Sequence, residues 1–535
     1  MLETGIKRER QIEKLKKTNF DCLIIGGGAT GAGAAHDAAL RGLTVAIIEM
    51  NDFSAGTSSR STKLIHGGIR YLGQFRFKLI REALRERKKL LNNAPHLVKP
   101  LKFVLPTYKC YEKPYYSIGL TLYDYLSGDS GLPYHKRISK DEAIKNIPSI
   151  EQEKLRGGIV YYDGQFNDSR LNVYLARAAE QAGATVCNRV SFESFVKENG
   201  KITRAVVKDL LSGETFEVKA NVFVNTAGVF IDEVRKKDDP SVGKVLAPSQ
   251  GIHLTFSKER IKCNTAMIIP KTSDGRVVFM IPWEDHVIMG TTDTPLNSVS
   301  AEPLPVGNEI DFLLETGNRF LNSKLNKEDI LSVFIGIRPL IAAGGEGETK
   351  KISREEAILV SDSGLITMGG GKWSTYRQMA EDLVDRIIKE GNLPQIKPCS
   401  THDFKFHGTK DYSENIYLKI MDIYGVSIET AQRLRNFYGG EVFDILGSKP
   451  EELLPDSGYF KEEVIHFIKN EFALSLMDVV ARRFRILFLN LKTTEALLEP
   501  IAKIMKQELN WTKEQNEAAI KEVKTLLEAL TKSIS

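Results

Sequence analysis

Cysteine is scarce in this 535-residue chain, and the five cysteines that it has are scattered along it. None of them forms a C-x-x-C pair or another spacing typical of metal ligands, and an odd number does not suit a disulfide framework. We therefore expect no metal site, no disulfide scaffold and a reducing compartment.

Long apolar runs are also missing, since no stretch approaches the roughly 18 to 20 apolar residues that span a bilayer. Residues 1–17 lack the apolar core of a secretory signal and are interpreted as a short surface helix or a frayed tail. The net charge of +5, from 74 basic and 69 acidic residues, is too mild to indicate nucleic acid by itself. The sequence thus predicts a globular protein that does not cross a membrane and does not bind nucleic acid.

The first ordered segment has the pattern of a dinucleotide-binding turn. An apolar strand at 21–25 runs into a G-x-G-x-x-G motif, and a small-residue helix follows at 32–41. In this motif the first glycine permits the tight turn, the second a close approach to a pyrophosphate, and the third close packing of helix on strand. The three glycines are Gly26, Gly28 and Gly31. A second strand at 44–48 ends in Glu49, whose carboxylate is expected to accept hydrogen bonds from a ribose.

NAD and FAD share this fingerprint, and the next segment favours FAD. Residues 51–70 are rich in hydroxyl groups and glycine, which suits a second pass along a pyrophosphate and flavin, although a solvated serine-rich loop is the alternative. Two later strands, at 222–225 and 365–368, also run into glycines, and these are expected to approach the cofactor or simply to end strands. The expected cofactor contacts in these segments are Thr57, Ser58, Ser61, Gly228 and Gly371.

Taken together, these motifs resemble those of the FAD-dependent glycerol-3-phosphate dehydrogenases, a family within the D-amino-acid-oxidase-like flavoproteins. The most specific block is the Lys-Leu-Ile-His-Gly-Gly-Ile-Arg-Tyr-Leu sequence at 63–72. The other matching blocks are the glycine motif at 26–31, Asn-Thr-Ala-Gly at 225–228, Gly-Thr-Thr-Asp at 290–293, Gly-Ile-Arg-Pro-Leu at 336–340 and Gly-Gly-Gly-Lys-Trp-Ser-Thr-Tyr at 369–376.

The resemblance implies FAD as cofactor and glycerol 3-phosphate as substrate, with hydride transfer from C2 to flavin N5. A phosphate dianion needs cations and a secondary alcohol needs a proton acceptor. The resemblance places Arg70, Tyr71, Arg354 and Lys372 in the substrate pocket, with Arg70, Arg354 and Lys372 around the phosphate, and Arg338 near the reacting hydroxyl. Thr291 either touches the pocket or belongs to a turn. His66 and His253 are both expected in the pocket, and the residues leave open which of them is the base.

Three functions remain open at this point. The first is a dehydrogenase that passes electrons to membrane quinone, with oxygen as the rival acceptor in an oxidase. The second is an amine or hydroxy-acid oxidase of the same fold, and the third is a flavin-bearing binding protein without turnover. The family resemblance favours the first, in the cytoplasm and peripherally attached to the inner (cytoplasmic) membrane. A homodimer is left open.

Two segments are candidates for the membrane contact, a basic amphipathic helix at 76–91 and an aromatic run at 115–126, although each also suits a core helix. The expected fold class is α/β, with a Rossmann-like FAD-binding domain, an interleaved β-rich substrate domain and a C-terminal helical domain. The expected boundaries are 18–75, 155–235 and 335–395 for the first, 76–154 and 236–334 for the second, and 396–535 for the third. The third domain shows helical periodicity at 474–489 and 515–529 and no calcium-binding loop, so we expect no calcium regulation.

Overall fold

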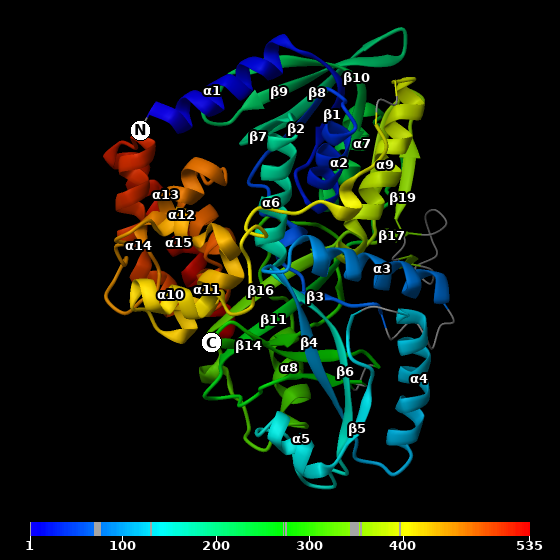
Figure 1. The fold of residues 1–535 in the computed structure, drawn as a ribbon. Helices are drawn as coiled ribbons and strands as arrows, with labels where there is room; N and C mark the ends of the chain where they lie inside the picture. Colours follow the sequence, from blue (N-terminus) through cyan, green and yellow to red (C-terminus); the bar gives the residue numbers. More distant parts are fainter. Residues whose placement is uncertain are drawn as a thin grey trace.

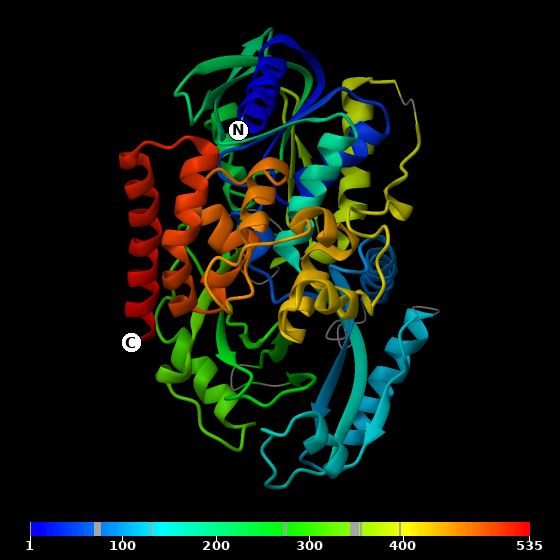
Figure 2. The ribbon, with the colours of Figure 1, turned by 60° about the vertical axis from the view of Figure 1, so that its left-hand side comes forward.

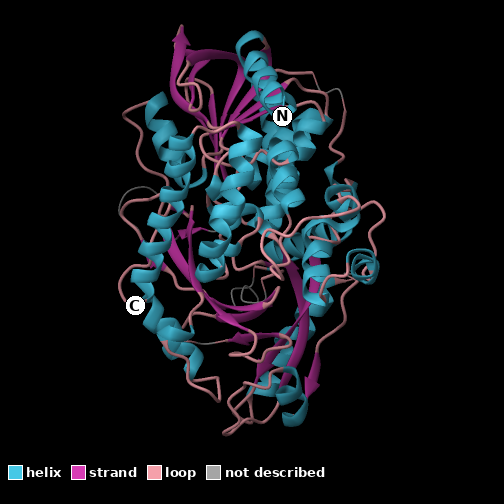
Figure 3. Cartoon of the chain, turned by 90° about the vertical axis from the view of Figure 1, so that its left-hand side faces the viewer, coloured by secondary structure: helices cyan, strands magenta, loops and turns pink. Residues whose placement is uncertain are grey.

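A computed structural model describes most of the chain (Figure 1). The described residues are 2–68, 76–128, 131–270, 272, 275–342, 352–353, 356–394 and 397–535. Figure 3 shows the strands gathered in an upper and a lower group, with helices between and around them. The α/β fold class expected from the sequence is confirmed.

The first sheet is mostly parallel and contains the glycine motif. In sheet order its strands are β19 (Ala357–Val360), β20 (Leu365–Gly369), β10 (Thr215–Asn225), β1 (Asn19–Ile25), β2 (Val45–Glu49) and β7 (Thr185–Asn188), with the antiparallel pair β8 (Val190–Glu198) and β9 (Lys201–Asp209) joined to β10. β1 lies between β10 and β2, both parallel to it. The glycine motif therefore follows a central strand, at the edge where the carboxyl ends of β1, β2 and β10 meet.

Helices cover both faces of this sheet because its central strands present buried apolar residues on both faces. The helices α2 (Ala29–Leu40), α6 (Asp168–Gln181) and α9 (Tyr376–Gly391) pack on one face, and α1 (Leu2–Lys17) and α7 (Ile231–Asp238) lie on the other. The alanines of α2 bring its backbone close to the sheet. Residues 2–17 form a complete helix, whose Ile12 and Leu15 are buried.

The second sheet forms the other end of the molecule. Its strands, in order, are β15 (Thr294–Pro295), β11 (Ser249–Ser257), β14 (His286–Gly290), β13 (Val278–Trp283), β12 (Ala266–Ile269), β4 (Val98–Pro106), β6 (Gly158–Phe166) and β3 (Leu64–Ile65), with β16 (Ser332–Arg338) beside β11 and β5 (Lys136–Ile138) beside β6. A separate short pair joins β17 (Ile341–Ala342) and β18 (Ile352–Ser353). The helices α5 (Lys140–Asn146) and α8 (Glu309–Asn318) pack against this sheet.

The strand pairing differs from the expected domain boundaries at three strands. β3 and β6 lie within ranges assigned to the FAD-binding domain and β16 crosses into one at residue 335, yet each pairs with strands of the second sheet. The physical reason is that the chain passes repeatedly between the sheets, so a strand at the end of one segment completes its hydrogen bonds in the neighbouring sheet.

The two candidate membrane segments are both helical but differ in what they expose. In α3 (Phe77–Asn93) the apolar residues Ile80, Ala83, Leu84 and Leu90 are buried. α4 (Glu112–Ser127), beside it in Figure 1, carries an exposed stripe that starts one residue before the helix. We call Tyr111, Tyr115, Ile118, Leu122 and Tyr125 the α4 stripe, and the exposed fractions of Ile118 and Tyr125 reach 74% and 77%. Since the spacing of three and four places them on one helix face, only α4 presents an apolar surface to its surroundings.

The last part of the chain is helical and packs against both other parts (Figure 2). Its helices are α10 (Ile416–Tyr424), α11 (Ile428–Tyr438), α12 (Val442–Leu446), α13 (Lys461–Asn470), α14 (Leu491–Leu509) and α15 (Lys513–Ile534). The expected regular helix at 474–489 is absent, and a π-helical turn at Asp478–Arg483 and a 3₁₀ turn at Ile486–Phe488 stand in its place. The left-handed Arg485, with φ 68°, separates the two turns, because a residue in that conformation cannot continue a helix.

Two buried histidines make the stability of this fold sensitive to acid. His36 on α2 and His96 before β4 are each 2% exposed, and burial lowers their pKa values to about 4 and about 3. Because both bind protons more weakly in the folded state, stability is complete above the unfolded pKa of about 6.5 and falls as the pH drops from there. Below about pH 6.5, we expect each histidine to lower the free energy of unfolding by up to about 1.4 kcal/mol per pH unit until the pH reaches its folded pKa.

Thermal unfolding between pH 7 and pH 4.5 measures this effect. We expect the pH dependence of Tm to become shallower in His36→Gln, and to stay unchanged when the exposed His402 is replaced in the same way. An equal slope in His36→Gln and the parent protein would contradict the assignment.

Candidate active site

The turn after β1 is built by glycines that no other residue could replace. Gly26 has φ +105°, and a Cβ added to it would lie 2.6 Å from the carbonyl oxygen of Thr226. A Cβ on Gly31 would lie 2.0 Å from the carbonyl oxygen of Gly26. Gly31 therefore does not face a ligand, and its role is to let α2 approach β1 and β10.

Glu49, at the end of β2, is engaged by the backbone of two loops. Its carboxylate accepts hydrogen bonds from the Gly27 amide at 2.8 Å and the Asn51 amide at 2.9 Å. Burial raises the pKa of this carboxyl, while the two amide donors act in the opposite direction. Glu49 thus ties the glycine turn to the loop that follows β2, and it also lines a cavity there.

A cavity of two connected parts begins at this turn. The part next to Glu49 has a volume of about 620 Å³, and the part that leads to the second sheet has about 310 Å³. The residues that line both parts are Gly28, Thr57, Ser58, Thr226 and Gly228. Because the two parts share these residues, they adjoin each other, and the larger part offers room for a dinucleotide with a small molecule beside it in the narrower part.

The middle of the cavity offers what a pyrophosphate requires. Gly28 at the start of α2 lines both parts, Ala29 and Thr30 line the narrower part, and the N-cap residue Gly28 has no side chain to cap the helix. Its amides and helix dipole therefore favour an anion. Ser58 Oγ accepts a hydrogen bond from the Ala29 amide at 2.9 Å, and a Cβ on Gly228 would meet no atom within 4 Å. The residues present thus fit a bound dinucleotide.

The hydroxyl-rich loop is held in place by hydrogen bonds to neighbouring elements. Thr57 Oγ1 donates to the Ile337 carbonyl at 2.7 Å, and Ser61 Oγ donates to Asp168 at 2.8 Å. Trp373 Nε1 donates to the Ser58 carbonyl at 2.7 Å. The Thr57 and Ser61 hydroxyls, expected at the cofactor, thus hold the loop against β16 and α6 while both residues line the cavity.

Arg338 lies at the end of β16 and reaches the narrower part of the cavity. Its guanidinium donates to Asp293 at 2.9 Å and to Thr291 Oγ1 at 3.2 Å, on the loop after β14. A Cβ on Gly251 would come within 2.5 Å of both Thr291 Oγ1 and an Arg338 nitrogen, so this glycine makes room for the pair. Thr291 is therefore a support for Arg338.

His253 on β11 lines the same part but is held deep in the protein. Its ring is 2% exposed, stacks on Phe334 at 4.5 Å between ring centroids, and places Nε2 2.9 Å from Thr62 Oγ1. Burial, together with the nearby charges of Lys63 and Arg338, holds its pKa well below the usual value. His253 is consequently neutral at physiological pH.

Lys63 lies behind this histidine and pairs with a buried carboxylate. Its ammonium nitrogen is 2.7 Å from Asp168 and 2.8 Å from the Ser59 carbonyl oxygen, and the side chain is 1% exposed. Burial lowers its pKa to about 7, helped by the charge of Arg485. The pair fixes the 59–63 backbone next to the cavity.

Two further residues expected in the substrate pocket, His66 and Lys372, line the narrower part, as does Gly371. Arg70, Tyr71 and Arg354 lie outside the described residues. Asp293 and Thr62 were missed by sequence reasoning, although Asp293 ends the Gly-Thr-Thr-Asp block and its charge next to a turn was a usable signal.

We expect Gly31→Ala to reduce FAD binding at least tenfold, since a methyl group against backbone costs about 1–3 kcal/mol. Flavin fluorescence during titration of the apoprotein measures this. Gly119→Ala is the matched control, because a Cβ at Gly119 on α4 meets nothing within 4 Å and binding should be unchanged. Full affinity in Gly31→Ala would show that the turn tolerates a side chain.

Comparison with known proteins agrees with this geometry. The profile of a family described as FAD dependent oxidoreductase matches residues 21–377, and the profile of the C-terminal domain of alpha-glycerophosphate oxidase matches residues 399–516. The mitochondrial glycerol-3-phosphate dehydrogenase of Mus musculus is 42% identical over 531 residues, which cover 94% of this chain and 73% of the mouse protein. The chain belongs to the FAD-dependent glycerol-3-phosphate dehydrogenase family.

Solved structures agree with this membership. The glycerol-3-phosphate dehydrogenase from Bacillus halodurans, complexed with FAD, has a TM-score of 0.79 and 29% identity, and the match covers 99% of each chain. The L-alpha-glycerophosphate oxidase from Mycoplasma pneumoniae, at 17% identity and a TM-score of 0.56 over 72% of this chain and 98% of that one, shares the fold. This family member is therefore an FAD-dependent enzyme.

The described residues contain neither a metal-binding cluster nor a membrane-spanning helix. No cluster of three or more His, Cys, Asp or Glu side chains that could hold a metal ion occurs among the described residues. Within the same residues, every helix is too short or too polar to traverse a bilayer.

Proposed function

We propose that this protein oxidises sn-glycerol 3-phosphate to dihydroxyacetone phosphate and passes the electrons to membrane quinone. The observation that carries the proposal is the small end of the dinucleotide cavity, where Arg338, Lys372 and two histidines meet, in a chain whose relatives are named glycerol-3-phosphate dehydrogenase. FAD, when bound, supplies the hydride acceptor. The residues proposed to hold it are Gly26, Gly28, Glu49, Thr57, Ser58, Ser61, Gly228 and Gly371, and Gly31 contributes only through the shape of the glycine turn.

The substrate phosphate would bind to cations around the narrow part of the cavity. Lys372 follows Gly371 at the cavity wall, where a half-buried ammonium attracts a dianion more strongly than it would in bulk water. Arg70 and Arg354 are proposed as further phosphate ligands, with Tyr71 beside them, on the family resemblance. A substrate with only a carboxylate would need fewer cations, which favours a phosphorylated alcohol over an amino acid.

The C2 hydroxyl would lie between Arg338 and a histidine. The guanidinium of Arg338 is held by Asp293 and Thr291, so it presents a fixed positive charge where negative charge develops on the oxygen as its proton leaves. His66, half-buried at the wall, is proposed to accept that proton. His253 is the poorer base, because burial lowers its pKa well below the usual value and Thr62 occupies its Nε2. We therefore propose that His253 lines the site as a neutral side chain and does not accept the proton.

A membrane partner is supported by the α4 stripe. Aromatic and aliphatic side chains exposed along one helix face are typical of contact with a lipid surface. We propose that the enzyme is cytoplasmic and peripherally attached to the inner (cytoplasmic) membrane, with quinone as acceptor; the stripe supports the attachment. Oxygen is the second candidate, because the C-terminal segment matches the domain of alpha-glycerophosphate oxidase.

An anaerobic titration with sn-glycerol 3-phosphate tests the reaction. We expect the flavin absorbance at about 450 nm to bleach with this substrate and to persist with D-amino acids. Reoxidation of the bleached enzyme, by a quinone analogue in vesicles or by air-saturated buffer, then separates the two acceptors. A yellow protein that the substrate does not bleach would refute the substrate assignment.

Replacement of Ile118 and Tyr125 by glutamate tests the membrane contact. Each new charge must remain in water, so we expect co-sedimentation with vesicles containing anionic lipid to fall at least tenfold. Leu418→Glu, at a residue 54% exposed on α10 in the helical domain, is the matched control and should bind vesicles like the parent. Unchanged sedimentation of the double variant would argue against the α4 stripe as the contact.

A further inference from the structure

The C-terminal domain reaches the cofactor cavity with side chains of its own. Met477, Arg482 and Glu522 line the larger part of the cavity, together with Gly28, Glu49 and other residues of the first sheet. We propose that this domain completes the FAD site, and that docking of its 477–485 segment retains the cofactor in the cavity.

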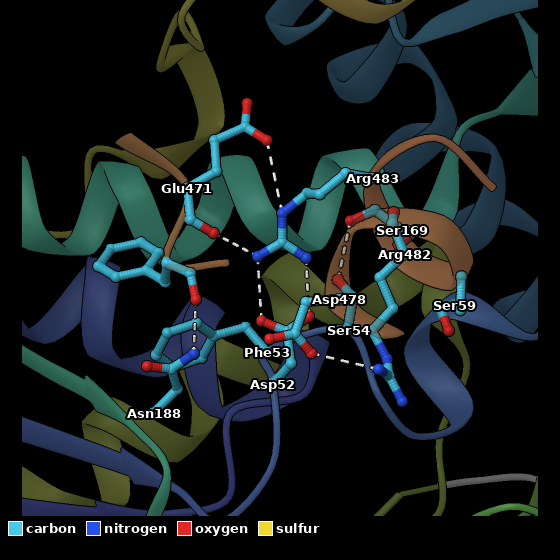
Figure 4. A network of polar contacts seen from close by, with 12 residues as sticks. Asp52, Phe53, Ser54, Ser59, Ser169, Asn188, Glu471, Asp478, Arg482 and Arg483 are labelled. Carbon is cyan, nitrogen blue, oxygen red and sulfur yellow. Dashed lines mark hydrogen bonds and ion pairs between the residues drawn. The ribbon is translucent and has the colours of Figure 1, made fainter. Parts of the chain in front are cut away.

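Arg483 connects the π-helical turn to Asp52, which lines the cavity (Figure 4). Its two terminal nitrogens donate to the Asp52 carboxylate at 2.7 and 3.0 Å, and it also donates to the Glu471 carbonyl. The Arg483 and Asp52 side chains are both 0% exposed. Asp52 and the adjoining Phe53 line the cavity, so this part of its floor is anchored by a residue more than 400 positions away in the chain.

Arg482 forms a second connection, through the substrate domain. It donates to Glu302 at 2.8 Å, and the other oxygen of Glu302 accepts from Arg60. Arg60 belongs to the hydroxyl-rich loop and lines the narrower part of the cavity, whereas Arg482 and Glu302 line the larger part. The Glu302 carboxylate thus bridges two arginines from different parts of the chain, so the bridge requires residues of all three domains.

Two more hydrogen bonds connect the π-helical turn to the FAD-binding domain. Ser169 Oγ, at the start of α6, donates to the Arg482 carbonyl at 2.7 Å, and Asp478 accepts from Arg189, which also lines the cavity. The side chain of Asp478 is 0% exposed and those of Arg482 and Arg189 are 6% and 20% exposed, so removal of either arginine leaves a buried carboxylate with less compensation. We therefore expect the π-helical turn to pack against the FAD-binding domain as one unit. When it does not pack there, the larger part of the cavity loses Met477 and Arg482 from its lining.

The test compares two buried arginines of the same domain. Arg482→Gln removes the bridge at the cavity, whereas Arg433→Gln removes a bidentate pair with Glu463 at 2.7 and 2.8 Å that does not reach the cavity. We expect Arg482→Gln to raise the FAD dissociation constant about tenfold or more, measured by flavin fluorescence on reconstitution of the full-length apoprotein. Arg433→Gln should lower Tm and leave the dissociation constant unchanged. Equal dissociation constants in Arg482→Gln and the parent, or equal increases in both variants, would overturn the proposal.

Hydrogen exchange on the unmodified protein gives a second readout that does not depend on a variant folding. FAD added to the apoprotein should slow amide exchange in 475–488 as well as in the 51–62 loop. Protection confined to the loop would overturn the proposal. Both readouts report FAD binding, so they hold even if glycerol 3-phosphate is not the substrate.

Discussion

Arg338→Met is expected to lower kcat/KM for sn-glycerol 3-phosphate by about 10²- to 10³-fold, the loss typical of removing one preorganised donor to a developing oxyanion. Methionine has a similar length but no charge, so the cavity keeps much of its shape while the field at the reacting oxygen disappears. Asp293 also loses its partner at 2.9 Å, which leaves a negative charge where the reaction needs a positive one. The rate of flavin reduction in anaerobic stopped-flow measurements tests this directly.

The control for Arg338 is Arg319→Met, which removes an exposed arginine just after α8 in the same domain. We expect its reduction rate to match that of the parent protein. The reduction rate of Asp293→Asn should lie between those of Arg338→Met and Arg319→Met, because Arg338 remains but is less firmly held. A reduction rate in Arg338→Met within a few-fold of the parent would place this residue away from the reacting atoms.

His66→Gln is expected to slow flavin reduction by about 10²- to 10⁴-fold, the range for loss of a general base. The base must be unprotonated to act, so the parent rate should rise with pH through one ionisation and then level off. In His66→Gln this ionisation should vanish from the profile. Stopped-flow reduction between pH 5.5 and 9 measures both effects.

His253→Gln is the comparison that separates the two histidines. Its ring is already neutral, so the ionisation in the rate profile should persist and the loss should reflect only the changed packing against Phe334 and Thr62. If the ionisation disappeared in His253→Gln and persisted in His66→Gln, the two assignments would have to be exchanged.

Much of the cofactor site could be predicted from residues close together in the chain. The G-x-G-x-x-G turn, the preceding strand and Glu49 form one continuous segment of 31 residues, Asn19 to Glu49, and the geometry of such a turn depends on local glycine conformation and helix polarity. The prediction of Glu49 was incomplete, because a sequence cannot tell that nearby amides of Gly27 and Asn51 already engage its carboxylate.

The sequence by itself thus determined the family and the cofactor and predicted the segments that approach it, since these depend on short motifs with local physics. The tertiary structure alone decided which side chains act together. Arg338 meets Asp293, and His253 meets Thr62, because β11 and its neighbours place residues far apart in the chain side by side. It also decided that 477–485 is a cavity wall rather than a regular helix. Burial and pairing of charges depend on the whole fold, and no local pattern encodes them.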